Sequence, residues 1–197
     1  DGTLYYNVVD LEKWDRALAL VHEVASMERS PTSRLDAGMA AALCGDKPYA
    51  DKTVADLQQG FPQNVAVGAY YAPQLTAAAD IGINDPVSAL QLLLGLGDYD
   101  QISFAPYLRG LAHEAVGQAP VAAVDYQAVL SHRGAEYLMG NDVYAMAQLG
   151  AARAAWANHD KQGSVAAYIR FLSLWPHADT KDPLVKEALA RTKAGSK

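Results

Sequence analysis

Small side chains recur at fixed intervals along the chain and are followed by an aromatic residue. In segment 107–130, Gly110, Gly117, Ala122 and Tyr126 are separated by seven, five and four residues. In two short antiparallel helices, the first small residue lets the second helix cross closely. The second occupies the turn, where glycine or asparagine tolerates a left-handed backbone. The aromatic residue follows one helical turn after the alanine, on the same face, and covers the hairpin. The pattern predicts paired helices and matches no catalytic device.

The same intervals recur at three other places. The equivalent sets are Gly38, Gly45, Ala50 and Val54; then Ala77, Asn84, Ala89 and Leu93; then Ala152, His159, Ser164 and Tyr168. A single hairpin cannot bury its own faces, whereas several stacked hairpins share a continuous core. The predicted fold class is therefore all-α, a superhelical stack of antiparallel helix hairpins.

Apolar residues follow helical spacing nearly everywhere, and the alternation typical of strands is nearly absent. Helix starts are marked at Ser30-Pro31, Asp85-Pro86 and Asp182-Pro183, where a capping side chain precedes a proline suited to the first helical position. The expected helices lie near 10–28, 31–44, 49–59, 65–81, 86–95, 102–116, 120–131, 142–157, 161–174 and 183–194.

Small residues at fixed positions are followed by an aromatic residue and, in two of the repeats, by a late proline, Pro62 or Pro176. This pattern resembles the tetratricopeptide repeat (TPR). This resemblance implies a TPR-like α-solenoid in which 1–197 is a single domain. Its predicted parts are a partial repeat at 4–28, repeats near 31–62, 65–97, 102–134 and 142–176, and a capping helix at 182–195. The departures from the family pattern are Asn84, His159 and Ser164, together with His113 and Ala155 in the aromatic slot before the turn.

The C-terminal half carries a narrower resemblance. The His132-Arg133-Gly134 turn and the ending Phe171-Leu172…Leu174-Trp175 are similar to the C-terminal TPR tails of large acidobacterial-type proteins. Those proteins carry a Ser/Thr kinase or a winged-helix domain at the N-terminus, followed by a membrane segment. The resemblance implies a bacterial signalling protein whose tail lies outside the cytoplasm, with a cytoplasmic location as the alternative. The chain starts without methionine, and we expect it to be part of a longer protein.

No constellation of residues predicts an enzyme. The kinase loops are absent, and "LGLGDYD" at 94–100 lacks the strand-then-helix context of a phosphate loop. No two histidines are three or four residues apart, so no helix face offers a two-histidine metal site. Cys44 has no histidine near it in sequence, and no serine lies in a nucleophile elbow. We therefore expect no catalytic residues, no metal and no cofactor.

The charge and hydropathy exclude two classes of partner. The net charge is −6 and there is no dense basic cluster, so nucleic-acid binding by this domain is not expected. No apolar run reaches the roughly 18 residues of a membrane span, so membrane insertion by this domain is not expected either. The remaining candidate is a protein or peptide ligand.

The first helices of the hairpins are expected to line a concave surface. Residues enriched at interface centres fall there, namely tyrosine, tryptophan, methionine and arginine. The predicted partner-binding groove consists of Tyr71, Gln74, Tyr107, Glu114, Met146, Arg153 and Trp156. Arg153 would pair with a carboxylate of the ligand. The alternative is that the aromatics belong partly to the core.

These observations favour a non-catalytic protein-interaction domain. One alternative is a structural or oligomerising spacer, for which a homo-oligomer is expected. Another is a small-molecule sensor with a pocket between helices.

Overall fold

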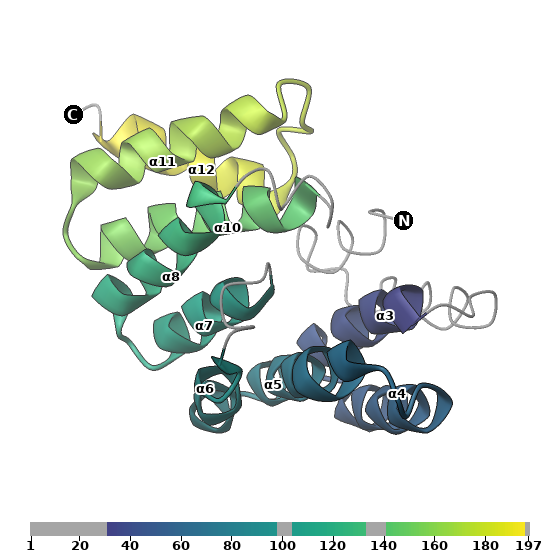
Figure 1. Ribbon diagram of the computed structural model, residues 1–197. Helices are drawn as coiled ribbons and strands as arrows, with labels where there is room; N and C mark the ends of the chain where they lie inside the picture. Colours follow the sequence, from purple (N-terminus) through teal and green to yellow (C-terminus); the bar gives the residue numbers. More distant parts are fainter. Residues whose placement is uncertain (1–30, 98–103, 133–140, 196–197) are drawn as a thin grey trace.

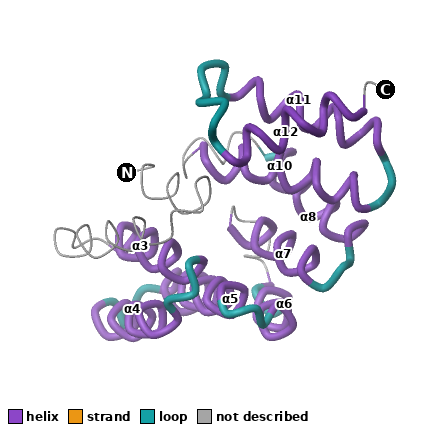
Figure 2. The backbone as a smooth tube through the Cα atoms, turned by 180° about the vertical axis from the view of Figure 1, so that it is seen from behind, coloured by secondary structure: helices purple, strands orange, loops and turns teal. Residues whose placement is uncertain are grey.

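The computed structural model describes residues 31–97, 104–132 and 141–195, and within these ranges the regular structure is entirely helical (Figure 1). The same ranges contain no strand, as Figure 2 shows from behind. The all-α class predicted from the sequence is confirmed. The helix expected at 10–28 and the partial repeat at 4–28 lie outside the described residues.

Helices make up most of the described ranges. In chain order they are α3 (Pro31–Leu43), α4 (Lys47–Gly60), η1 (Val67–Tyr71), α5 (Ala72–Gly82), α6 (Pro86–Leu94), α7 (Phe104–Ala115), α8 (Ala119–Ser131), α10 (Asn141–Ala157), α11 (Lys161–Leu174) and α12 (Pro183–Gly195). Each predicted repeat thus contains one helix pair: α3–α4, α5–α6, α7–α8 and α10–α11. Most boundaries lie within two residues of the sequence expectation.

The four turns inside these pairs share one backbone conformation. Gly45, Asn84, Gly117 and His159 have φ angles of 83°, 63°, 76° and 62°, in the left-handed region. These are the four turn slots of the sequence pattern, so that prediction is confirmed. At each turn the following residue donates its N–H to the carbonyl five residues earlier, as Asp46 does to Ala41 at 3.0 Å. This is the Schellman arrangement, which satisfies carbonyls at the helix end.

The residue after each left-handed position begins the next helix. The side chains of Asp46, Asp85 and Asp160 accept hydrogen bonds from backbone N–H groups three residues later, at 3.1, 3.2 and 2.9 Å. At the third turn, Gln118 provides no such side-chain bond. One helix therefore ends and the next begins within three residues, and the local sequence sets the direction of both helices.

The helix pairs pack against one another in chain order. The second helix of each pair contacts the next first helix: α4 on α5, α6 on α7, α8 on α10, and α11 on α12. The first helices also contact in series, α3 with α5, α5 with α7, and α7 with α10. Figure 1 shows the resulting arc, from α3 and α4 at one end to α11 and α12 at the other.

Tyr126 of α8 fills the junction between two pairs. A Cβ placed on Gly110 of α7 would lie 2.5 Å from Tyr126 Cε1, and one on Gly150 of α10 would lie 2.4 Å from Tyr126 Cζ. The ring is fully buried, and its hydroxyl donates to Glu114 Oε2 at 2.8 Å. Glycine on both sides gives the ring its space, so the aromatic residue covers its own hairpin and meets the next one.

The first pair uses glycine in a similar way. A Cβ on Gly38 of α3 would lie 2.8 Å from Cγ2 of Thr53. Thr53 therefore packs against Gly38, one position before Val54, the residue that the sequence pattern assigned to this contact. A Cβ on Gly82 would lie 2.0 Å from the carbonyl oxygen of Ala42, which brings the ends of α5 and α3 into backbone contact. These contacts explain why small residues recur both within and between the pairs.

The helix predicted over 65–81 differs from the structure, because its start is a π-helix. In η1, the N–H of Ala72 donates to Val67, five residues earlier. Pro73 follows at the start of α5. Proline has no N–H, and in an α-helix its ring would clash with the carbonyl four residues earlier. A wider turn before Pro73 avoids that clash.

Replacing Gly150 with alanine is expected to lower the free energy of unfolding by about 1–2 kcal/mol. The cost of overpacking against Tyr126 exceeds the gain of roughly 1 kcal/mol in helix propensity. Urea denaturation followed by circular dichroism measures the change. Gly68→Ala is the control, since a Cβ there meets nothing within 4 Å. It should stabilise the protein slightly, and a Gly150→Ala variant as stable as wild type would contradict the packing argument.

Candidate functional site

Five residues of α10, α11 and α12 form a cluster in which one residue, Tyr168, is buried and the other four are half-buried. Arg153 donates from Nε to Glu187 Oε1 at 3.0 Å and from Nη2 to Glu187 Oε2 at 2.6 Å. The hydroxyl of Tyr168 donates to the same Oε1 at 2.7 Å. Arg191 lies over the ring of Trp156, 4.2 Å from its centroid. We call these five residues the Trp156 cluster.

Ionisation within this cluster follows from its contacts. Burial opposes the charge of Glu187, but the hydrogen bonds from Arg153 and Tyr168 outweigh it and hold the pKa of Glu187 below its ordinary value. Burial likewise opposes the charge of Arg153, and its bonds to Glu187 nevertheless raise the pKa of Arg153. Burial and the bond to Glu187 raise the pKa of Tyr168. The pair is therefore charged at neutral pH and ties α12 to α10.

Arg153 already has a carboxylate partner within the chain. The sequence predicted that Arg153 would pair with a ligand, but both of the carboxylate oxygens of Glu187 are bonded to it. Arg191 forms no ion pair among the described residues and is half-buried against Trp156. Arg191 is thus the cation of this cluster that can still pair with an anionic group of a partner. It was not among the groove residues predicted from the sequence.

The other groove residues fall into two groups. Gln74, Tyr107 and Met146 lie in the interior, with exposed fractions of 0, 2 and 6%. Tyr71 and Glu114 are half-buried, and Glu114 accepts the hydroxyl of Tyr126. Tyr107 thus belongs to the core, as the alternative prediction expected for some of the aromatics. Its ring centroid lies 6.2 Å from that of Tyr126. Of the predicted residues, Arg153 and Trp156 belong to the Trp156 cluster, whereas Tyr107 and Glu114 meet around Tyr126. The charge of Glu114 also acts on Arg153.

Gln74 of α5 is a buried amide without a partner. Neither its Nε2 nor its Oε1 has a hydrogen-bond partner in the described structure. An unsatisfied buried polar group costs roughly 1–3 kcal/mol, so such groups are rare. Gln74 directly follows Pro73 at the start of α5, three residues after the π-helix η1 ends at Tyr71.

A buried ionic network between α7 and α8 was not predicted. Arg109 Nε donates to Asp125 Oδ1 at 2.9 Å, and His113 Nδ1 lies 2.6 Å from Asp125 Oδ2. All three side chains are at most 12% exposed. Arg109 and His113 are four residues apart on one helix face, which is the sequence signal for a shared partner. Nothing in the sequence identified Asp125 as that partner.

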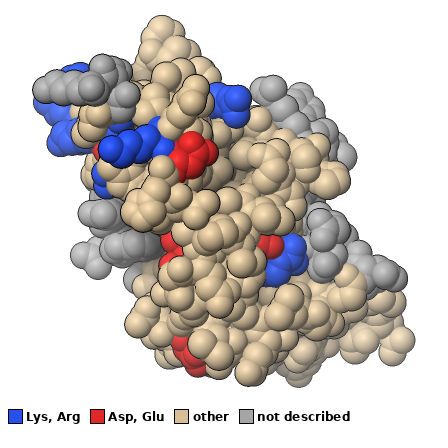
Figure 3. All heavy atoms as spheres, turned by 90° about the vertical axis from the view of Figure 1, so that its left-hand side faces the viewer, with Lys and Arg blue, Asp and Glu red and all other residues tan. Residues whose placement is uncertain are grey.

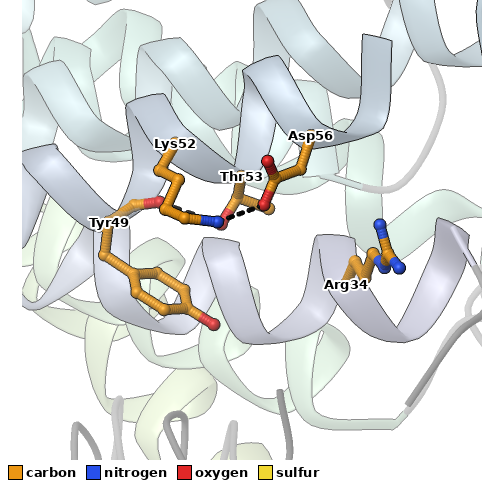
Figure 4. A pocket seen from close by; sticks show the side chains of 5 residues that line it. All are labelled: Arg34, Tyr49, Lys52, Thr53 and Asp56. Atoms are coloured by element: carbon orange, nitrogen blue, oxygen red, sulfur yellow. Dashed lines mark hydrogen bonds and ion pairs between the residues drawn. The ribbon is translucent and has the colours of Figure 1, made fainter. Parts of the chain in front are cut away.

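A cavity of about 240 Å³ lies between α3 and α4 (Figure 4). Its lining consists of Arg34 of α3 and of Tyr49, Lys52, Thr53 and Asp56 of α4. Lys52 forms an ion pair with Asp56. Thr53 donates its hydroxyl to the Tyr49 carbonyl at 2.9 Å, within its own helix. From the sequence, a pocket between helices was expected only as an alternative and without a location.

Charge is unevenly distributed over the surface. Figure 3 shows lysine and arginine side chains gathered over one end of the face in view, with mostly uncharged surface beyond them. The exposed cations of α11 and α12 are Lys161, Arg170, Lys186 and Lys193. The end of the arc that carries the Trp156 cluster is thus its basic end, although the whole chain is acidic.

Within 31–97, 104–132 and 141–195, no three His, Cys, Asp or Glu side chains form a group that could hold a metal ion. In the same ranges no helix has both the length and the apolar character needed to cross a membrane. Burial raises the pKa of the Cys44 thiol to about 11, so this cysteine is a poor nucleophile at neutral pH.

Comparison with models of protein families, with curated proteins and with solved structures found no match for this chain.

Replacing Glu187 with glutamine is expected to lower the free energy of unfolding by about 1–2 kcal/mol at pH 7, because Arg153 then loses its counter-ion. The pKa of Glu187 is lower in the folded state than its ordinary value of 4.5. Its contribution is therefore complete above that value and is lost as the pH falls through the lowered folded pKa. The difference between wild type and variant should shrink in this acidic range.

Urea titrations at several pH values measure this difference. Asp51→Asn, which removes an exposed ion pair with Lys47 within α4, is the control and should change stability little. A difference between wild type and Glu187→Gln that does not vary with pH would contradict the role of the charge.

Replacing Gln74 with methionine is expected to raise the free energy of unfolding by about 1–2 kcal/mol, because it removes two unsatisfied polar groups and retains a long side chain. Thermal and urea denaturation measure the gain. The exposed Gln127 of α8 serves as control, since Gln127→Met should give no gain. If Gln74→Met lowers stability, the amide must have a partner.

Proposed function

We propose that the chain is a non-catalytic protein-interaction domain built as a TPR-like superhelix. The observation that carries this proposal is the repetition of one turn at Gly45, Asn84, Gly117 and His159, each between two paired helices. The chain-order packing of successive pairs supports it further. Arrays of this kind present the first helices of their pairs along one extended surface, which suits an elongated partner.

The proposed binding surface is centred on the Trp156 cluster. Trp156 is a half-buried aromatic beside the cation of Arg191, and tryptophan and arginine are the residue types most often found at the centre of interfaces. Arg153 and Glu187 hold each other in place, so α10 and α12 present this pair on a fixed support. The partner is a peptide segment that carries an acidic residue for Arg191 and an apolar side chain for Trp156.

The proposed biological setting is the C-terminal part of a larger bacterial signalling protein, a Ser/Thr kinase or a transcriptional regulator. The support is the resemblance of the turn at His132 and of the ending at Phe171 and Trp175. In this setting the domain recruits a partner, and the catalytic or DNA-binding unit belongs to another part of the protein.

Trp156→Ala combined with Arg191→Gln is expected to weaken peptide binding at least about 20-fold, since each residue would contribute as an interface anchor. Peptides are selected from a random displayed library against the wild-type protein, and their affinities are measured by calorimetry. Arg170→Gln, which removes an exposed cation from α11, should leave the affinities unchanged.

Two outcomes would contradict this proposal. One is an unchanged affinity in a double variant with wild-type circular dichroism. The other is a concentration-dependent dimer, seen by light scattering, that the double variant abolishes. The second outcome would favour the oligomerising spacer.

A further inference from the structure

The cavity between α3 and α4 contains one cation that no carboxylate of the described residues neutralises. The ammonium of Lys52 is paired with Asp56. The guanidinium of Arg34 has no carboxylate within ion-pair distance among the described residues. Arg34 is half-buried, so part of its hydration is already lost. Because the Lys52–Asp56 pair is neutral, the lining carries a net positive charge that is due to Arg34.

Four of the lining residues come from one face of α4. Tyr49, Lys52, Thr53 and Asp56 are spaced as neighbours on that face, and the seven steps from Tyr49 to Asp56 span roughly 10 Å at 1.5 Å per residue. Figure 4 shows Tyr49 at one end of this group and Arg34 at the other. A Cβ on Gly60 would lie 4.0 Å from Arg34 Nη1, which places the guanidinium beside the last turn of α4.

The volume limits the size of a ligand. Pockets for drug-sized ligands start at roughly 300 Å³, so a cavity of about 240 Å³ suits a molecule of amino-acid size. An aromatic ring at one end and a planar cation at the other match a ligand with an apolar group and an anionic group.

We propose that this cavity binds a small organic carboxylate, with the carboxylate on the guanidinium of Arg34 and the apolar group against the ring of Tyr49. Arginine is suited to this because its planar fork makes two parallel hydrogen bonds to one carboxylate. A cation beside the C-terminal turn of α4 also stabilises the helix dipole. That role accounts for the charge, but it does not require an open space between Arg34 and Tyr49.

This site is independent of the Trp156 cluster. Figure 1 places α3 and α4 at the opposite end of the arc from α11 and α12. If the Trp156 cluster binds no peptide, the carboxylate site is unaffected. If the cavity binds no carboxylate, the proposed binding surface at the Trp156 cluster is unaffected. The test variants also differ, and Arg170→Gln serves as the control for both.

The test compares two probes of nearly identical shape, sodium phenylacetate and the uncharged phenylacetamide. Calorimetry gives Kd, and amide NMR locates the binding. Phenylacetate should bind about tenfold or more tightly than the amide, with shift changes at residues 34, 49 and 53, and added salt should weaken it. Arg34→Gln should weaken phenylacetate binding by a similar factor. Arg34→Lys should retain part of it, and Arg170→Gln should retain all of it.

A second arm identifies the source of the carboxylate. An acetylated and amidated Phe-Glu dipeptide presents the same chemistry as part of a polypeptide. Tighter binding of phenylacetate indicates a free acid, and tighter binding of the dipeptide indicates an acidic side chain of a protein. Either result supports the carboxylate site if it depends on Arg34.

Three outcomes would overturn the proposal. They are no binding of either carboxylate at millimolar concentration, equal binding of acid and amide, and unchanged binding in Arg34→Gln. If Arg34→Gln loses the wild-type circular dichroism, the comparison of acid with amide on the wild-type protein still decides.

Discussion

The close contact of α7, α8 and α10 depends on a single aromatic ring. Tyr126 occupies a space that exists only because Gly110 and Gly150 have no side chains. Tertiary packing supplies most of the stability of short helices, so this close approach matters more than their intrinsic propensity. The position of the ring also fixes its hydroxyl, which in turn holds Glu114. The absence of a side chain at Gly110 and at Gly150 thus determines how closely the α7–α8 pair packs against α10.

Polar contacts join neighbouring helices at a few points, within the α7–α8 pair and between α10 and α12. Asp125 joins Arg109 and His113 across α7 and α8, and Glu187 joins α12 to α10. Hydrogen bonds are directional whereas apolar contacts are not, so these groups fix the register of helices that apolar packing alone would allow to shift. Their cost of desolvation is offset only while every partner is present. The interior therefore combines adaptable alanine-rich surfaces with a few strictly paired charges.

The features that could be predicted from the sequence are those set by local chemistry. A left-handed turn requires glycine, asparagine or another tolerant residue at one position, and this made the slots at Gly45 and Asn84 recognisable. The π-helix was missed although Pro73 marks it. The burial of Gln74, Tyr107 and Met146 depends on how closely neighbouring pairs approach, which a single helical pattern does not encode. For the same reason the cavity at Arg34 could not be located, because its lining comes from two helices.

The order of helix packing has a consequence for how the chain acquires its structure. The main contacts join each helix to one of its next two neighbours along the chain. Low contact order of this kind shortens the loops that must close before contacts form, and it favours rapid folding. A ribosome releases the N-terminal pairs first, and each can begin to bury its apolar face before the rest of the chain has been synthesised. Assembly can thus proceed in the direction of translation, and α12 packs on α11 after the preceding pairs have formed.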